Sequence, residues 1–203
     1  MIKIEKDLNK GKDFLKRGKV IVARTDTLYG ILGNALDKNV VERIYKIKGR
    51  KIDKPYIVLI PDISFLEFFE LEPSKEEKIL LKSKGVTVII PTKNPEKFKY
   101  LHRGKNEIAF RIPEDESLIK LMEEIKIPLV APSANLEGKP PAKNVEEAVK
   151  YFGDKIDLYI DSGEVKNEFP STIVKIENGK IKIVREGNVS YNKIKEILEK
   201  ERC

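Results

Sequence analysis

The sequence contains very few of the side chains that bind metals or act as nucleophiles. Its 203 residues include one cysteine, Cys203, one histidine, His102, and no tryptophan. One cysteine and one histidine cannot form a zinc site or a cysteine–histidine catalytic pair within one chain. His102 lies in the polar stretch YLHRGKN with no serine motif nearby, so a catalytic triad is unsupported and a surface position is expected for it. We expect no zinc, haem or flavin.

Long apolar runs and the common phosphate-binding loops are absent too. No apolar stretch approaches the ~20 residues that a membrane helix needs, and the N-terminal MIKIEKDLNK does not have the apolar centre of a signal peptide. We therefore expect a cytoplasmic protein that does not contact a membrane. Neither G-x-x-x-x-G-K-[ST] nor G-x-G-x-x-G occurs. If the protein binds a nucleotide, another arrangement must hold the phosphates.

Positive charge, by contrast, is in excess. Lysine and arginine number 40 against 33 aspartates and glutamates, which gives a net charge of +7 that is spread along the chain. This surplus suits a nucleic acid or a polyanionic small ligand, although a solvated lysine-rich surface is its commoner cause. The length and the 40% hydrophobic content predict one sizeable core. We expect a single domain over residues 1–203, with a core of about 10–190 and a C-terminal helix at 190–202.

Apolar segments with strand character alternate with helical patterns. Strands are predicted at 19–23, 56–60, 86–90, 107–112, 127–131 and 157–161, and a hairpin over 171–184 that turns at Asn178-Gly179. Helices are predicted at 40–47, 74–83, 116–126, 144–153 and 190–202, with Ser74, Asn144 and Ser190 as N-caps. The alternation of strands and helices together with a hairpin predicts an α/β fold with a twisted sheet that mixes parallel and antiparallel strands.

Two cations follow an amphipathic segment near the N-terminus. The stretch 23–50 reads as a hydroxyl-rich turn that runs straight into a helix ending at Lys48 and Arg50. If the chain leaves the helix at Gly49, both side chains can bind one anion, because arginine offers a planar fork and lysine a point charge. The helix dipole also favours cations at this end. The pair is therefore either an anion site or a structural cap.

Polar residues also follow other predicted strands. Ser133 and Asn135 come directly after the apolar segment 127–131, which is where ligands bind in open α/β folds. Both residues are also common turn formers. Arg185 ends the second strand of the hairpin, and Gly187 permits close approach of another backbone. A surface arginine on an edge strand is the alternative interpretation.

Six short motifs occur in an order that resembles one family. They are TDTLYG at 25–30, KGR at 48–50 with KP at 54–55, FRIP at 110–113, PSAN at 132–135 with Gly138 after it, PSTIV at 170–174, and REG at 185–187. In order and spacing they resemble the YrdC/TsaC-type threonylcarbamoyl-AMP synthases, in their short single-domain form. The resemblance implies a mixed α/β sheet folded around a basic concave cavity.

The resemblance also implies an activity, partners and site residues. Members of this family combine L-threonine, bicarbonate and ATP, with Mg²⁺ bridging the phosphates, into threonylcarbamoyl-adenylate and pyrophosphate. A partner transferase then modifies tRNAs that read ANN codons, and direct binding of tRNA or double-stranded RNA is possible. No protein side chain is expected to bind the metal. The residues implied for ATP are Lys48, Arg50, Asn135 and Arg185, those for threonine are Thr25, Arg111, Ser133 and Ser171, and Lys54 and Thr87 are possible additions.

Two other functions stay open at this point. Arg24 replaces a proline usual in the family, and the segments 30–34 and 83–87 also depart from its pattern. Such changes would suit a YciO-like paralogue that binds RNA or a nucleotide without chemistry. A carbamoyl-transfer module like that of HypF proteins shares the fold but normally has further domains. The hydroxyl and amide donors at positions 25, 133, 135 and 171 favour the enzyme, because binding of an RNA backbone needs mainly positive charge.

Overall fold

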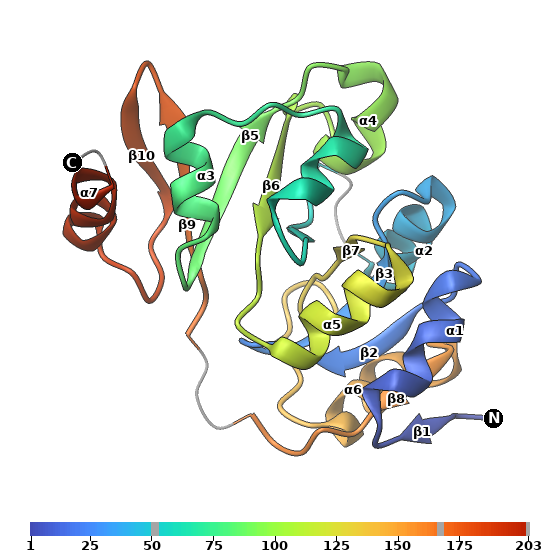
Figure 1. Cartoon of the computed structure of the whole chain (residues 1–203). Coiled ribbons are helices and arrows are strands. Elements are labelled where there is room, and N and C mark those ends of the chain that lie inside the picture. Colours follow the sequence, from blue (N-terminus) through green and yellow to red (C-terminus); the bar gives the residue numbers. More distant parts are fainter. Residues whose placement is uncertain (50–52, 166–168, 202–203) are drawn as a thin grey trace.

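The chain forms a mixed sheet that runs through the whole molecule (Figure 1). The computed structural model describes residues 1–49, 53–165 and 169–201. Neighbouring strands follow the order β1-β8-β2-β3-β7-β4-β6-β5-β9-β10. Their bounds are β1 (Ile4–Glu5), β2 (Ile21–Arg24), β3 (Tyr29–Asn34), β4 (Val58–Leu59), β5 (Val86–Pro91), β6 (Glu107–Arg111), β7 (Leu129–Val130), β8 (Leu158–Ile160), β9 (Thr172–Glu177) and β10 (Lys180–Arg185).

The sheet contains both parallel and antiparallel pairs, as the sequence predicts. The pairs β1–β8, β2–β8, β4–β6 and β5–β9 are parallel. The pairs β2–β3, β3–β7, β4–β7, β5–β6 and β9–β10 are antiparallel. The hairpin β9–β10 turns at Asn178 and Gly179, both with positive φ, which confirms the predicted turn.

Helices cover both faces of the sheet. They are α1 (Gly11–Lys16), α2 (Lys38–Lys48), α3 (Lys75–Leu81), α4 (Pro95–His102), α5 (Glu116–Ile125), α6 (Val145–Phe152) and α7 (Tyr191–Lys200), with 3₁₀ turns η1 (Leu8–Lys10), η2 (Ile63–Phe69) and η3 (Gly153–Lys155). In the described part, no helix is long and apolar enough to cross a membrane.

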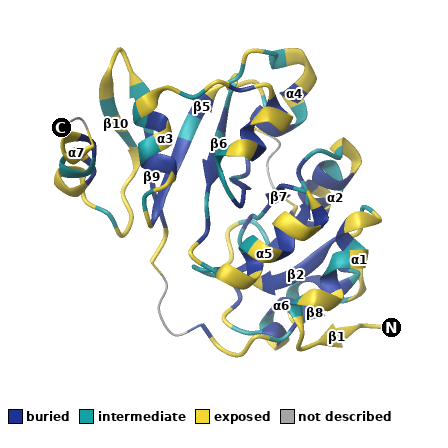
Figure 2. Ribbon diagram, in the orientation of Figure 1, coloured by how far each residue is buried: buried dark blue, intermediate teal, exposed yellow. Residues whose placement is uncertain are grey.

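The two faces of the sheet hold two apolar cores. In β2, Ile21 and Ala23 pack into the core under α1 and α5, whereas Val22 packs into the larger core under α2, α3, α4 and α6. Residues of a strand point alternately to opposite faces, so a strand covered on both sides must be apolar throughout. Figure 2 shows the result, with buried central strands and exposed outer faces on the helices.

Capping residues fix the helix ends that the sequence predicts. The Ser74 side chain accepts from the Glu77 amide and the Glu77 carboxylate accepts from the Ser74 amide, so the capping box is confirmed. Asn144 caps α6 and Ser190 caps α7, also as predicted. Gly49, with φ of 60°, ends α2 in the left-handed region. The chain therefore does leave the helix directly after Lys48.

One central strand was missed by the sequence interpretation. The predicted path from a hydroxyl-rich turn straight into a helix is wrong, because β3 lies between them. Its glycines conceal the strand pattern, and Gly33 is required by packing. A Cβ atom at Gly33 would lie 2.6 Å from Val40 Cγ1 and 2.8 Å from Ile44 Cδ1. Glycine lets α2 lie directly on β3.

The predicted surface position of His102 is also wrong. The residue is buried at the end of α4. Its Nδ1 accepts from the amides of Gly104 (3.0 Å) and Asn106 (3.2 Å), and its Nε2 lies 2.7 Å from the carbonyl oxygen of Pro95. Because Nδ1 accepts, Nε2 carries the proton and donates to Pro95. The imidazole closes the turn after α4 and has a structural role.

Candidate functional site

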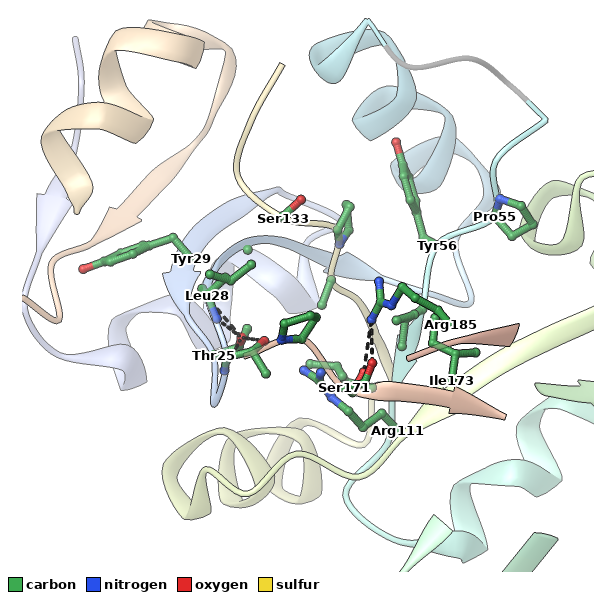
Figure 3. A pocket seen from close by; sticks show the side chains of 17 residues that line it. Thr25, Leu28, Tyr29, Pro55, Tyr56, Arg111, Ser133, Ser171, Ile173 and Arg185 are labelled. Atoms are coloured by element: carbon green, nitrogen blue, oxygen red, sulfur yellow. Dashed lines mark hydrogen bonds between the residues drawn. The ribbon is translucent and has the colours of Figure 1, made fainter. Parts of the chain in front are cut away.

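A pocket of about 260 Å³ lies between the ends of the central strands and the β9–β10 hairpin (Figure 3). Its volume is at the lower end of the range of about 300–1,000 Å³ typical of small-molecule sites. The pocket brings together five residues implied for the substrates. They are Thr25, Arg111, Ser133, Ser171 and Arg185.

Thr25 lies in the tight turn between β2 and β3. Its Oγ1 donates to the carbonyl oxygen of Leu28 (2.8 Å) and accepts from the amides of Thr27 (3.3 Å) and Leu28 (3.2 Å). These bonds fold the backbone back within four residues and bury most of Thr25. The hydroxyl is therefore held at a fixed point of the pocket wall.

Arg111 ends β6 and forms a buried ion pair that the sequence interpretation did not include. Its Nη2 donates to Asp26 Oδ1 at 2.8 Å, and the two side chains are only 8% and 9% exposed. Asp26 also accepts from the Glu114 amide at 3.2 Å. Burial lowers the pKa of the Arg111 guanidinium, and Asp26 opposes that effect. The one signal in the sequence was an acidic residue between two threonines after an apolar strand.

Arg111 lines the pocket, and its guanidinium donates to Asp26 through Nη2. Its Nε is buried and has no partner among the described residues. A guanidinium offers five N–H donors in a planar fork, which matches a carboxylate. Arg111 can therefore retain Asp26 and still bind an acidic ligand.

The hairpin side of the pocket combines hydroxyls with a second arginine. Thr87 and Ser171 are both buried, and their hydroxyl oxygens lie 2.8 Å apart. Arg185 donates through Nη2 to the Ser171 carbonyl oxygen (2.9 Å) and lies 3.4 Å from its Oγ. Figure 3 shows the contacts between Arg185 and Ser171 as dashed lines. Thr87 supports Ser171 from behind and does not itself line the pocket.

Arg185 is exposed and has no carboxylate partner in the part of the chain that the structure describes. The pKa of its guanidinium is lowered, first by desolvation and then by repulsion from Arg111. Two guanidinium groups thus act on the same small volume. That arrangement favours an anionic ligand between them.

Gly187 allows the hairpin to approach this wall. A Cβ atom there would lie 2.3 Å from the carbonyl oxygen of Pro170 and 2.5 Å from the carbonyl carbon of Ser171. Both are backbone atoms that cannot move aside as a side chain would. The close approach predicted at Gly187 is confirmed.

Ser133 and Asn135 lie in the loop after β7, as predicted, but only Ser133 lines the pocket. The Ser133 hydroxyl donates to Asn135 Oδ1 (2.6 Å), and Asn135 Nδ2 donates to the carbonyl oxygens of Leu136 (2.9 Å) and Lys139 (2.8 Å). Asn135 is committed to the shape of its own loop. It lies behind Ser133 rather than in the pocket.

A direct contact with ATP would require Lys48 to be exposed in the cavity, and that expectation is wrong. Lys48 is only 1% exposed, and its ammonium group donates to the carbonyl oxygens of Ser133 and Asn135. Lys54 is exposed and pairs with Glu137 at 2.7 Å, outside the pocket lining. Arg50 lies outside the described residues.

No cluster of three or more histidine, cysteine, aspartate or glutamate side chains occurs among residues 1–49, 53–165 and 169–201. The polar groups in the pocket are hydroxyls and guanidinium groups, which do not favour divalent cations. The pocket is built to hold an anion.

Comparisons with known proteins identify the family of this chain. A family model for Sua5, YciO and YrdC proteins, described as "Telomere recombination", matches residues 13–187. A Methanocaldococcus jannaschii protein named putative threonylcarbamoyl-AMP synthase is 37% identical over 195 residues, covering 94% of this chain and 92% of that protein. A Pyrococcus abyssi threonylcarbamoyl-AMP synthase is 32% identical over 187 residues, covering 91% of this chain but 55% of that protein.

A solved structure extends the likeness to three dimensions. The crystal structure of P. abyssi Sua5 complexed with L-threonine superposes with a TM-score of 0.85 at 29% identity, covering 98% of this chain and 61% of that one. The chain thus spans little more than half the length of the P. abyssi relative and nearly all of the M. jannaschii relative. The family match over residues 13–187 decides the assignment. This chain belongs to the Sua5, YciO and YrdC family.

Proposed function

We propose that this chain is an L-threonylcarbamoyladenylate synthase, a nucleotidyltransferase that converts L-threonine, bicarbonate and ATP into threonylcarbamoyl-adenylate and pyrophosphate. The observation that carries the proposal is the pocket in which Arg111 and Arg185 converge with Thr25, Ser133 and Ser171. The named relatives and the threonine complex of P. abyssi Sua5 support the choice of substrates.

The chemistry explains why the pocket needs cations and donors but no imidazole or thiol. The threonine amine attacks carbon dioxide derived from bicarbonate, loses a proton and becomes a carbamate. A carbamate oxygen then attacks the α-phosphorus of ATP, and pyrophosphate leaves. Threonine carboxylate, carbamate, ATP and pyrophosphate are all anionic. Fixed donors aimed at such groups stabilise developing charge without having to reorganise.

The residues divide into two groups in this proposal. Arg111, held by Asp26, would bind the carboxylate of threonine through donors that the ion pair leaves available. Thr25, Ser133 and Ser171 would supply hydroxyl contacts to threonine.

Arg185 would contact the phosphates of ATP, because it is the arginine of the pocket without a carboxylate partner in the described residues. Three further residues would assist ATP binding, namely Arg50, Lys54 and Asn135. Mg²⁺ would arrive with ATP and neutralise phosphate charge. Within the part of the chain that the structure describes, the pocket lining offers no carboxylate to the ion, so phosphate oxygens and water would hold it.

The product is an activated acyl-adenylate. In the proposed pathway a partner transferase uses it to form threonylcarbamoyladenosine in tRNAs that decode ANN codons. The synthase would then act in the cytoplasm as one step of tRNA modification.

Pyrophosphate release tests the proposal directly. Purified protein with ATP and Mg²⁺ should release pyrophosphate when L-threonine and bicarbonate are both present and stay at background when either is omitted. Absence of turnover from folded protein that still binds threonine would refute the synthase. Salt-sensitive RNA binding without turnover is the result that the RNA-binding alternative predicts.

A further inference from the structure

Lys48 joins the end of α2 to the loop after β7 through both its side chain and its backbone. The ammonium donates to the carbonyl oxygens of Ser133 and Asn135, the latter at 2.8 Å, and to Asn135 Oδ1 at 3.2 Å. The carbonyl oxygen of Lys48 accepts from the Glu137 amide at 3.1 Å. Lys48 thus binds this loop with its ammonium group and with its carbonyl oxygen.

The oxygens of this loop suit the chemistry of an ammonium group. Lysine Nζ carries three N–H donors, and the loop presents three oxygens to it. Hydrogen bonds from a charged donor are roughly twice as strong as neutral ones. Because Lys48 is only 1% exposed, removing it would withdraw a charged donor from all three oxygens in a buried setting. The Ser133 carbonyl oxygen would keep the Asn135 amide, and Asn135 Oδ1 would keep the Ser133 hydroxyl.

The loop held by Lys48 carries one wall of the pocket. From its other side, β3 holds the same loop, since Ile31 donates to Pro132 (2.8 Å) and Ala134 donates to Tyr29 (2.7 Å) through backbone groups. Ser133 also forms a bridge with Gly30. Ser133 is therefore fixed between β3 and the Lys48 ammonium, and its position depends on both.

From this arrangement we infer that Lys48 is a positioning residue, which sets Ser133 in the pocket wall by binding the loop 133–137. It does so without lining the pocket itself. The inference changes the role that the family resemblance implies, a direct contact with ATP phosphates. It rests on the proposed function only in taking threonine as the ligand at Ser133.

Threonine affinity without ATP separates the two roles. Lys48→Met keeps an unbranched side chain but removes the charge and all three donors. The matched control is Lys46→Met, since Lys46 is an exposed lysine in the same last turn of α2. Calorimetric titration of L-threonine in the absence of ATP should show binding weakened about tenfold or more in Lys48→Met and unchanged in the control. Unchanged threonine affinity with weakened ATP affinity would overturn the inference and restore the phosphate contact.

A second measurement does not depend on any substrate. Hydrogen exchange followed by mass spectrometry should show faster exchange in the peptide covering residues 131–139 of Lys48→Met, with the peptides of β5 and β9 unchanged. Unchanged exchange in 131–139 would overturn the inference even if the wild-type protein failed to bind threonine. If Lys48→Met does not fold, Lys48→Arg decides on the same two readouts, because its planar fork keeps the charge but cannot reproduce the three contacts.

Discussion

The two sides of the pocket use their polar groups differently. The inner side includes Thr25, residues 27–30, Arg111 and the loop 131–133, and the hairpin side includes Pro170, Ser171, Ile173 and Arg185. On the inner side, Thr25 is bonded within its turn, Arg111 to Asp26, and Ser133 to Asn135. On the hairpin side, the exposed Arg185 has only the oxygens of one serine as partners in the described chain.

The inner side therefore sets the shape of the pocket, and the hairpin side supplies positive charge for a ligand. A side whose polar groups are already bonded is rigid and can define the outline of a small ligand such as threonine. An exposed cation without a carboxylate partner in the described residues can bind a larger, mobile anion such as a triphosphate. Substitutions on the inner side should therefore change stability most, and those at Arg185 should change ligand binding most.

The largest loss of stability is expected on the inner side from Asp26→Ala. This change leaves the buried Arg111 guanidinium without its carboxylate, and breaking a buried pair in this way costs about 3–5 kcal/mol. Urea unfolding measures the effect. Asp13→Ala, an exposed acid in α1, is the control and should change little. A loss of less than about 0.5 kcal/mol for Asp26→Ala would mean that the inner side is not held by this pair.

A smaller loss is expected on the hairpin side from Gly187→Ala. The added methyl group would contact the backbone of Pro170 and Ser171, so the hairpin must shift, at a cost of about 1–3 kcal/mol. The same shift should weaken threonine binding, because both residues line the pocket. Glu186→Ala, at the exposed neighbouring position, should leave both quantities unchanged. Equal stability of the two variants would contradict the close approach.

Thr87→Val should cost about 1 kcal/mol, since it removes one of two buried hydroxyls that bond each other. A double-mutant cycle with Ser171→Ala tests whether the bond itself is responsible. The double variant should be more stable than the sum of the two single losses predicts. Strict additivity would show that Thr87 does not support Ser171.

Arg185→Ala should cause the smallest change in stability, within about 0.5 kcal/mol, because the residue is exposed. ATP affinity should nevertheless fall about tenfold or more, while threonine affinity changes less. Lys182→Ala on the same strand is the control, since its partner is Glu177 outside the pocket. A larger effect on threonine than on ATP would reverse the division between the two sides.

Local signals in the sequence predict much of the fold but not the assembly of the site. The hairpin turn at Asn178-Gly179 and the caps Ser74, Asn144 and Ser190 depend on neighbouring residues alone, and all are confirmed. The convergence of Thr25, Arg111, Ser133, Ser171 and Arg185 in one pocket was not visible in their spacing. It came from the resemblance to a family.

Long-range contacts explain what the sequence did not predict. Asp26 and Arg111 are 85 positions apart, so nothing local marks them as an ion pair. A lysine at the end of an amphipathic helix is normally solvated, and the burial of Lys48 depends on carbonyl groups of a distant loop, which any residue type could supply. His102 is buried for the same kind of reason, since its partners are backbone groups.

Incorporation of ¹³C from bicarbonate tests the central claim, that the pocket joins threonine, the carbon of bicarbonate and the adenylate of ATP. Protein incubated with ATP, L-threonine and ¹³C-bicarbonate should form a product whose mass equals that of threonylcarbamoyl-adenylate carrying one heavy carbon. The product should vanish when any substrate is withheld and decrease strongly in Arg185→Ala. Formation of AMP without incorporated label, or no product from protein that binds both threonine and ATP, would contradict the account.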